Sequence, residues 1–185
     1  MSDELPFETP RGRLSPEDLA AITEAVAARP ELWEDELNQT TAERTYADVF
    51  TNEHLGVWAI SWMADEHDTG FHDHDRSSGG VHVVRGRIRH EHLRMGERPS
   101  GTAVEAGQSF CFDGTFIHRM RRDSGAGPTI TIHAYSPPLT RTGQYGECDD
   151  GLLHRTPTDA EEQLKPHGYQ GTPTDRQQFA RSSQG

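Results

Sequence analysis

The strongest constraint on the fold is a two-residue alternation of apolar and polar side chains, which recurs in short runs between residues 44 and 136. Side chains two apart along a β-strand lie on the same face, so the alternation predicts strands with one buried face. Glycines separate the runs and no helical pattern lies between them, which favours an antiparallel sandwich or barrel. The predicted strands cover residues 46–50, 55–63, 80–87, 88–94, 108–112 and 129–136.

One helix is predicted ahead of these strands. Ser15 is a good helix cap and Pro16 suits the first turn. Leu19, Ile22 and Val26 then recur at helical spacing and form an apolar stripe. The chain therefore divides into three parts. These are a flexible N-terminus at residues 1–14, a β-rich domain with this helix at residues 15–140, and a polar C-terminal extension at residues 141–185.

Composition argues against several classes of partner. The chain has 18 Lys and Arg against 30 Asp and Glu, a net charge of −12, whereas phosphate binding requires clustered basic residues. We therefore expect no nucleic-acid partner. No apolar run is long enough to span a membrane, and the first residues lack a signal-peptide pattern. Cys111 and Cys148 are too few for a disulfide framework, which favours a cytoplasmic protein.

A metal site is predicted from the histidines. His72 and His74 are two residues apart, so on a strand both imidazoles face the same side. His118 follows after a turn and is expected on a neighbouring strand. Three neutral nitrogen donors would leave open positions on a redox-active ion such as Fe(II). Alone, a His-Asp-His segment is also compatible with a merely polar rim of the barrel.

The surrounding residues resemble the two motifs of the cupin superfamily. The stretch 70–74, followed by Gly86, is similar to the first motif, and Gly107 and Gly114 ahead of His118 are similar to the second. The resemblance implies an all-β cupin, a double-stranded β-helix or jelly-roll barrel with a short N-terminal helical segment. Residues 15–140 would form the cupin domain.

One position departs from the common metal-cupin pattern. Most metal cupins carry a glutamate ligand after the two histidines, and Gly79 stands at that position here. The resemblance then implies a site of three histidines without a carboxylate. Such a ligand set carries no charge, so a bound Fe(II) would keep its full positive charge and attract an anionic thiolate.

A second resemblance is more specific. The segments HDHDRSSGG, HRM and ITIHAYSPPL, within residues 44–140, resemble the cysteine dioxygenase family of thiol dioxygenases. That family implies an Fe(II) enzyme that adds both atoms of O2 to the sulfur of a small thiol and produces a sulfinic acid. It also implies catalytic roles for Thr131, His133 and Tyr135 in one hydrogen-bonded chain. Their spacing of two independently permits such a chain on one strand face.

The substrate is less well defined by the sequence. In this family an arginine two residues after a tyrosine binds the substrate carboxylate, and the matching segment here runs from Tyr46 to Asp48. An aspartate repels a carboxylate, so Asp48, with Tyr46, Trp62 and Phe71, predicts a pocket for a cationic thiol of the ergothioneine or cysteamine type.

Two alternatives stay open. If Asp48 faces solvent, an arginine elsewhere in the chain binds the carboxylate of the substrate. The enzyme is then a cysteine or 3-mercaptopropionate dioxygenase. The candidates for that role are Arg44, Arg85, Arg87 and Arg119. An alternative of another class is a non-catalytic metal-binding cupin that senses a small molecule.

Overall fold

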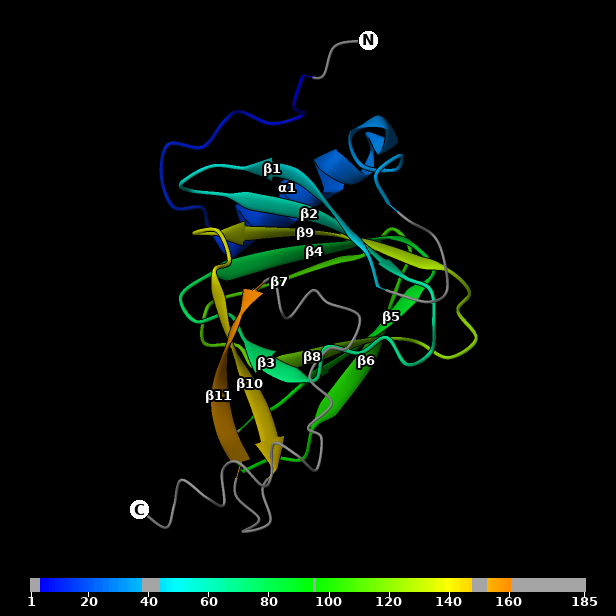
Figure 1. Cartoon of the computed structure of the whole chain (residues 1–185), viewed down its shortest axis with the longest axis vertical. Helices are drawn as coiled ribbons and strands as arrows, with labels where there is room; N and C mark the ends of the chain where they lie inside the picture. Colours follow the sequence, from blue (N-terminus) through cyan, green and yellow to red (C-terminus); the bar gives the residue numbers. More distant parts are fainter. Residues whose placement is uncertain (1–3, 38–43, 95, 148–152, 161–185) are drawn as a thin grey trace.

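Two antiparallel sheets face each other in the computed structural model, which describes residues 4–37, 44–94, 96–147 and 153–160 (Figure 1). One sheet has the order β1-β2-β9-β4-β7 and the other the order β11-β10-β3-β8-β5-β6. This arrangement confirms the predicted all-β cupin. The strands are β1 (Tyr46–Thr51), β2 (Gly56–Trp62), β3 (Phe71–Asp73), β4 (Ser78–Arg85), β5 (Arg87–His92), β6 (Ser100–Glu105), β7 (Ser109–Phe112), β8 (His118–Arg122), β9 (Thr129–Ser136), β10 (Arg141–Glu147) and β11 (Leu153–Asp159).

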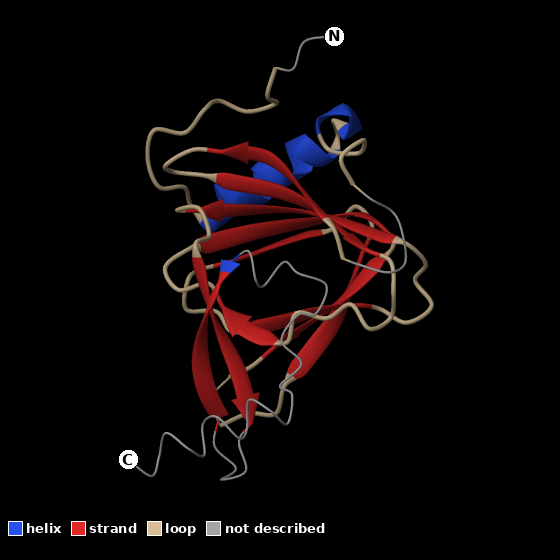
Figure 2. Ribbon diagram, viewed as in Figure 1, coloured by secondary structure: helices blue, strands red, loops and turns tan. Residues whose placement is uncertain are grey.

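The helix α1 (Pro16–Ala27) packs across the outer face of the five-stranded sheet (Figure 2), and the short 3-10 helix η1 (Pro30–Leu32) follows it. Ser15 caps α1 as predicted, because its side chain accepts a hydrogen bond from the backbone N–H of Asp18. Leu19 is fully buried, and Gly80 of β4 lets the helix approach closely. A Cβ at Gly80 would lie 2.5 Å from the backbone nitrogen of Ala20.

Strand β9 is the central strand of this sheet and pairs with β2 and β4. All eight of its residues are buried. Its apolar residues Ile130, Ile132 and Ala134 belong to the core cluster beneath α1. Because strand side chains alternate, the residues between them face the second sheet and the interior of the barrel.

The second sheet contains two short strands, at the places where the sequence expected the histidine pair and His118 to lie on neighbouring strands, although it did not give their bounds. Strand β3 has three residues and β8 has five, and their registered pair is His72 opposite His118. His74 lies one residue beyond the end of β3. The pairing of these two strands therefore brings the histidine pair and the third histidine to one place in the barrel.

A C-terminal hairpin of β10 and β11 extends the second sheet next to β3. Asp73, between His72 and His74, faces this hairpin and accepts hydrogen bonds from Tyr145 Oη at 2.8 Å and from Arg155 Nε and Nη2 at 2.6 and 2.9 Å. Residues 141–147 and 153–159 of the polar extension predicted from residue 141 are thus β-strands, whereas residues 148–152 and 161–185 lie outside the described residues.

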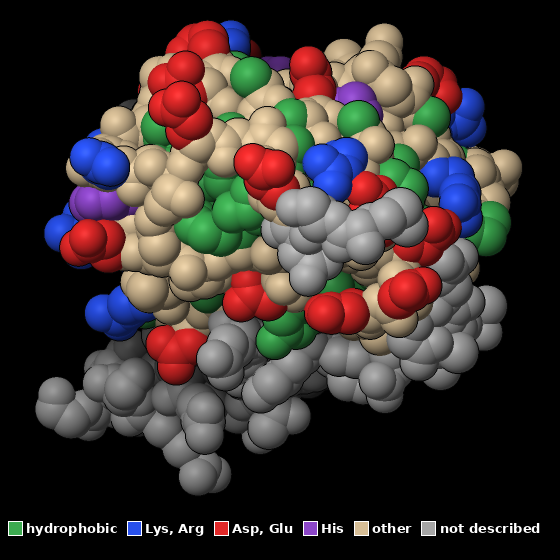
Figure 3. Space-filling view, turned by 90° about the horizontal axis from the view of Figure 1, so that it is seen from above, with side chains coloured by type: hydrophobic (Ala, Val, Ile, Leu, Met, Phe, Trp, Pro, Cys, Tyr) green, Lys and Arg blue, Asp and Glu red, His purple; other side chains and the backbone are tan. Residues whose placement is uncertain are grey.

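The outer surface above α1 carries acidic and basic side chains in a mixed distribution (Figure 3). Within the described residues, no helix combines the length and the apolar character that a bilayer crossing needs.

The docking of the hairpin predicts a stability effect. Arg155→Met removes a bidentate contact with the buried carboxylate of Asp73 and should lower the free energy of unfolding by about 1–2 kcal/mol, less than for a fully buried pair because Arg155 is partly exposed. Urea denaturation followed by circular dichroism measures it. Arg141→Met, at an exposed position of the same hairpin, is the control, and equal stability of the two variants would contradict the prediction.

Candidate metal centre and adjoining cavity

The three histidines of the predicted metal site converge. His72, His74 and His118 are all buried, and one ring nitrogen of each lies within 4.8 Å of the others. The Nε2 atoms of His74 and His118 are 3.3 Å apart. Two nitrogens bound to one ion at about 2.1 Å each lie about 3–3.5 Å from one another, so this spacing fits a shared metal ion.

Burial keeps these imidazoles neutral, as metal ligands must be. It lowers the pKa of His72 to about 4 and holds the pKa values of His74 and His118 well below the ordinary histidine value. The other nitrogen of His72, Nδ1, donates to the carbonyl of Gly70 at 3.0 Å, and Gly70 has a φ of +66° that suits glycine. This hydrogen bond leaves Nε2 of His72 for the ion.

The position of the missing carboxylate is filled by an aromatic ring. A Cβ at Gly79 would lie 2.3 Å from Cζ of Phe112, so that ring occupies the space where a longer side chain would extend. Phe112 stacks on His74 with ring centroids 4.5 Å apart and also packs against His118 at 4.7 Å. The absence of the glutamate was predictable from the sequence, whereas Phe112 was not, because its only signal was an apolar residue at the end of a strand.

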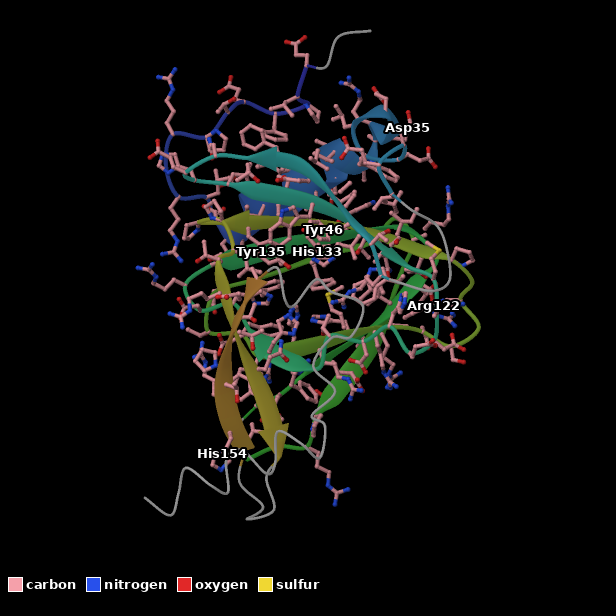
Figure 4. All side chains as sticks on the ribbon, in the orientation of Figure 1. Asp35, Tyr46, Arg122, His133, Tyr135 and His154 are labelled. Carbon is pink, nitrogen blue, oxygen red and sulfur yellow. The ribbon has the colours of Figure 1, made fainter. Side chains whose placement is uncertain are left out.

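A chain of hydrogen bonds runs beside the three histidines on the inner face of β9. Trp62 Nε1 donates to Thr131 Oγ1 at 2.9 Å, Thr131 Oγ1 is 2.8 Å from His133 Nε2, and His133 Nδ1 is 3.0 Å from Tyr135 Oη. Figure 4 shows His133 and Tyr135 on the side of β9 that faces the second sheet. The chain contains the three predicted residues and adds the indole of Trp62.

The indole fixes the direction of this chain. A Trp N–H can only donate, so Thr131 Oγ1 accepts from it. If Thr131 accepted from His133 as well, its own hydroxyl hydrogen would be buried without an acceptor, because among the described residues His133 Nε2 is the other atom hydrogen-bonded to this hydroxyl. Thr131 therefore donates to His133 Nε2. His133 then carries its own proton on Nδ1 and donates to Tyr135 Oη. Burial lowers the pKa of His133 to about 3 and raises that of Tyr135, so the phenol stays protonated and its hydrogen is directed elsewhere.

A cavity adjoins both the metal centre and this chain. Its walls include His72 of the ligand set, His133 and Tyr135 of the chain, and several apolar side chains. The remaining lining residues are Arg44, Trp58, Ile60, Trp62, Thr69, Met120, Leu139 and Ala160. A small molecule in this cavity would touch a ligand histidine and the phenol together.

Arg44 is the charged group of this wall. It is 4% exposed, and its guanidinium carbon lies 5.1 Å from the ring centroid of Trp62. Burial lowers its pKa to about 10, partly offset by Asp68 and Tyr135, so the side chain remains a cation at neutral pH. Among the arginines that the sequence offered as carboxylate partners, Arg44 is the one that lines the cavity.

Of the four predicted substrate-binding residues, one lines the cavity and three do not. Trp62 lines the cavity. Tyr46 is 43% exposed and is not among the described cavity residues, although its ring lies 6.4 Å from that of the lining residue Trp58. Asp48 is exposed, accepts hydrogen bonds from Thr51 Oγ1, and is not among the described cavity residues. Phe71 precedes His72 on β3 and faces away from the cavity, with Arg119 5.8 Å from its ring.

Fold and site together define a class, a cupin with a carboxylate-free cluster of three histidines. The profile of the family described as cysteine dioxygenase type I matches residues 11–148, and the chain belongs to this family. Cysteine dioxygenase type 1 of Homo sapiens is 23% identical over 133 residues, and that of Danio rerio is 23% identical over 134. Each match covers 66% of this chain and 66% of the relative, just under two thirds of the length of these proteins.

Solved structures also align with the chain. The protein TT1209 from Thermus thermophilus aligns with a TM-score of 0.48 and 13% identity, over 56% of this chain and 92% of that one. KdgF from Halomonas sp. aligns with a TM-score of 0.45 and 19% identity, over 56% of this chain and 91% of that one.

Proposed function

We propose that this protein is a non-haem Fe(II) thiol dioxygenase, which combines a small thiol with O2 to give the corresponding sulfinic acid. The observation that carries the proposal is a buried, carboxylate-free histidine cluster beside a directed hydrogen-bond chain, with one cavity touching both. Family membership supports the reaction class. A thiol substrate also suits the reducing cytoplasm in which we expect the protein to act.

The donor set fits Fe(II). His72, His74 and His118 would hold the ion through neutral nitrogens, and imidazole is a ligand that iron accepts well. Bound iron would supply open coordination positions for a thiolate and for dioxygen, together with the electron density that dioxygen requires.

The protein's own groups orient the reactants. Tyr135 Oη accepts from His133, so its hydrogen is free to be donated to a polar atom of the substrate or of dioxygen in the cavity. Thr131 and Trp62 hold His133 in the tautomer that this arrangement requires. The aromatic and aliphatic walls exclude water, which strengthens each of these interactions.

The cavity favours a thiol that carries a carboxylate. Arg44 offers a buried guanidinium, and guanidinium groups bind carboxylates through paired hydrogen bonds. The case for a cationic thiol such as ergothioneine or cysteamine rests on Asp48, which is exposed and bonded to Thr51. We therefore favour the class of cysteine and 3-mercaptopropionate, and the cationic thiols become the competing outcome.

Oxygen uptake tests the proposed reaction. Iron-loaded protein should consume one O2 per thiol and release a sulfinate in which both new oxygens derive from 18O2. Oxygen uptake and mass spectrometry measure the two quantities over a panel of cysteine, 3-mercaptopropionate, cysteamine and ergothioneine. No uptake with any thiol, despite tight binding of iron, would instead support the non-catalytic metal-binding sensor.

Substitution of Arg44 tests the substrate class. Arg44→Met should lower kcat/KM for a carboxylate-bearing thiol by roughly 100-fold, because a charged hydrogen-bonded pair inside a cavity is typically worth about 2–5 kcal/mol. Turnover of cysteamine, which lacks a carboxylate, should change little. Asp48→Asn is the matched control and should leave kcat/KM for the carboxylate thiol unaltered. A wild-type preference for cationic thiols that Asp48→Asn abolishes would refute the role of Arg44.

Substitution of Thr131 tests the hydrogen-bond chain. Thr131→Val preserves the shape of the side chain but removes the hydroxyl between Trp62 and His133, so it should lower kcat by about 10–100-fold with little change in KM. Thr131→Ser keeps the hydroxyl and should retain most of the activity. Steady-state oxygen uptake distinguishes the variants, and similar kcat values for Val and Ser would contradict the proposed direction of the chain.

A further inference from the structure

A second His-x-His segment, formed by His90 and His92 on β5, lies beside the metal centre and has no part in the reaction proposed above. Strand β5 pairs with β8, and the register sets His92 opposite His118. His90 is buried, and its ring stacks on Phe110 with centroids 4.0 Å apart and an interplanar angle of 19°. The ring of His90 is therefore held in a fixed orientation within the barrel.

His90 contacts one of the three converging histidines directly. Its Nε2 lies 2.8 Å from Nδ1 of His118, whereas Nε2 of His118 points to His74. A neutral imidazole that gives its Nε2 lone pair to a cation carries its proton on Nδ1. His118 must then donate from Nδ1 and His90 must accept, which places the proton of His90 on its own Nδ1 and leaves its ring uncharged.

We propose that His90 is a positioning residue of the metal centre, whose Nε2 fixes the tautomer and ring orientation of His118 without adding charge. This inference rests on the metal centre of the proposed function but not on the reaction at the thiol. Metal-binding histidines usually donate to a carboxylate, a backbone carbonyl or water. A carboxylate beside His118 would add negative charge near the ion, and an imidazole adds none. His90 thus orients a ligand and preserves the positive charge of the centre.

Metal binding tests the orienting role, with Co(II) as a spectroscopic probe of the full-length protein. His90→Leu removes the acceptor and should weaken Co(II) binding by about 10–100-fold, as losses of such partners generally do. His90→Gln keeps an acceptor at a similar reach and should bind almost as tightly as wild type. His92→Gln is the control on the same strand, because the His92 ring bonds to Ser100. Affinities come from anaerobic competition with a chelator, and the d–d absorption reports ligand geometry.

Charge is tested by comparing His90→Glu with His90→Gln, which have the same size. The glutamate should lower the Fe(III)/Fe(II) potential relative to the glutamine, because it adds negative charge next to His118. This pair keeps the inference testable even if His90→Leu does not fold. The positioning role of His90 would be overturned if His90→Leu bound Co(II) with wild-type affinity and an unchanged spectrum. Equal reduction potentials in His90→Glu and His90→Gln would also overturn it. If metal binding responds as expected while the wild type oxidises no thiol, the dioxygenase assignment fails and the role of His90 stands.

Discussion

The pleat of β9 positions both the apolar core and the polar side chains beside the three histidines. The strand is buried on both faces, so its side chains must alternate between the core beneath α1 and the interior of the barrel. A shift of one residue would place the isoleucines in the cavity and the polar residues under the helix. Packing of the helix therefore fixes the register, and the register places Thr131, His133 and Tyr135 in line. The three side chains of the hydrogen-bond chain are aligned because the apolar core beneath α1 holds β9 in this register.

The same reasoning explains which parts of the fold were predictable. Strand β9 was predicted with its observed ends, because its alternating β-branched and aromatic residues are typical of a strand. His72 and His118 were expected on neighbouring strands, but the bounds of β3 and β8 were not predictable, because these strands are short and rich in charged and imidazole side chains. Their strand conformation comes from pairing with neighbours, which a local pattern does not reveal. The polar strands β10 and β11 were missed for the same reason.

For substrate binding, the family pattern predicted that Asp48 lines the pocket. In the structure, the charged residue that lines the cavity is Arg44. Strand β1 is the edge of its sheet, and Asp48 is exposed there although it is paired with the cavity residue Trp58. Arg44 precedes the first residue of the strand, and its long side chain reaches inward over Trp62. The reach of a guanidinium is not set by strand register, so spacing alone cannot locate it. The convergence of His72, His74 and His118 was predictable because short histidine side chains remain close to their strand positions.

Burial determines which groups around the three histidines and the cavity are charged, and therefore which substrate charge the cavity favours. The burial that keeps the three imidazoles neutral also keeps His133 and Tyr135 uncharged. Asp73 lies between two ligand histidines, but strand parity turns its carboxylate outward to Arg155 and Tyr145. Among the described groups that line the cavity, Arg44 is the one that carries a positive charge. A cationic thiol would be repelled by both Arg44 and a metal ion, whereas a molecule with a thiolate and a carboxylate presents one anionic group to each.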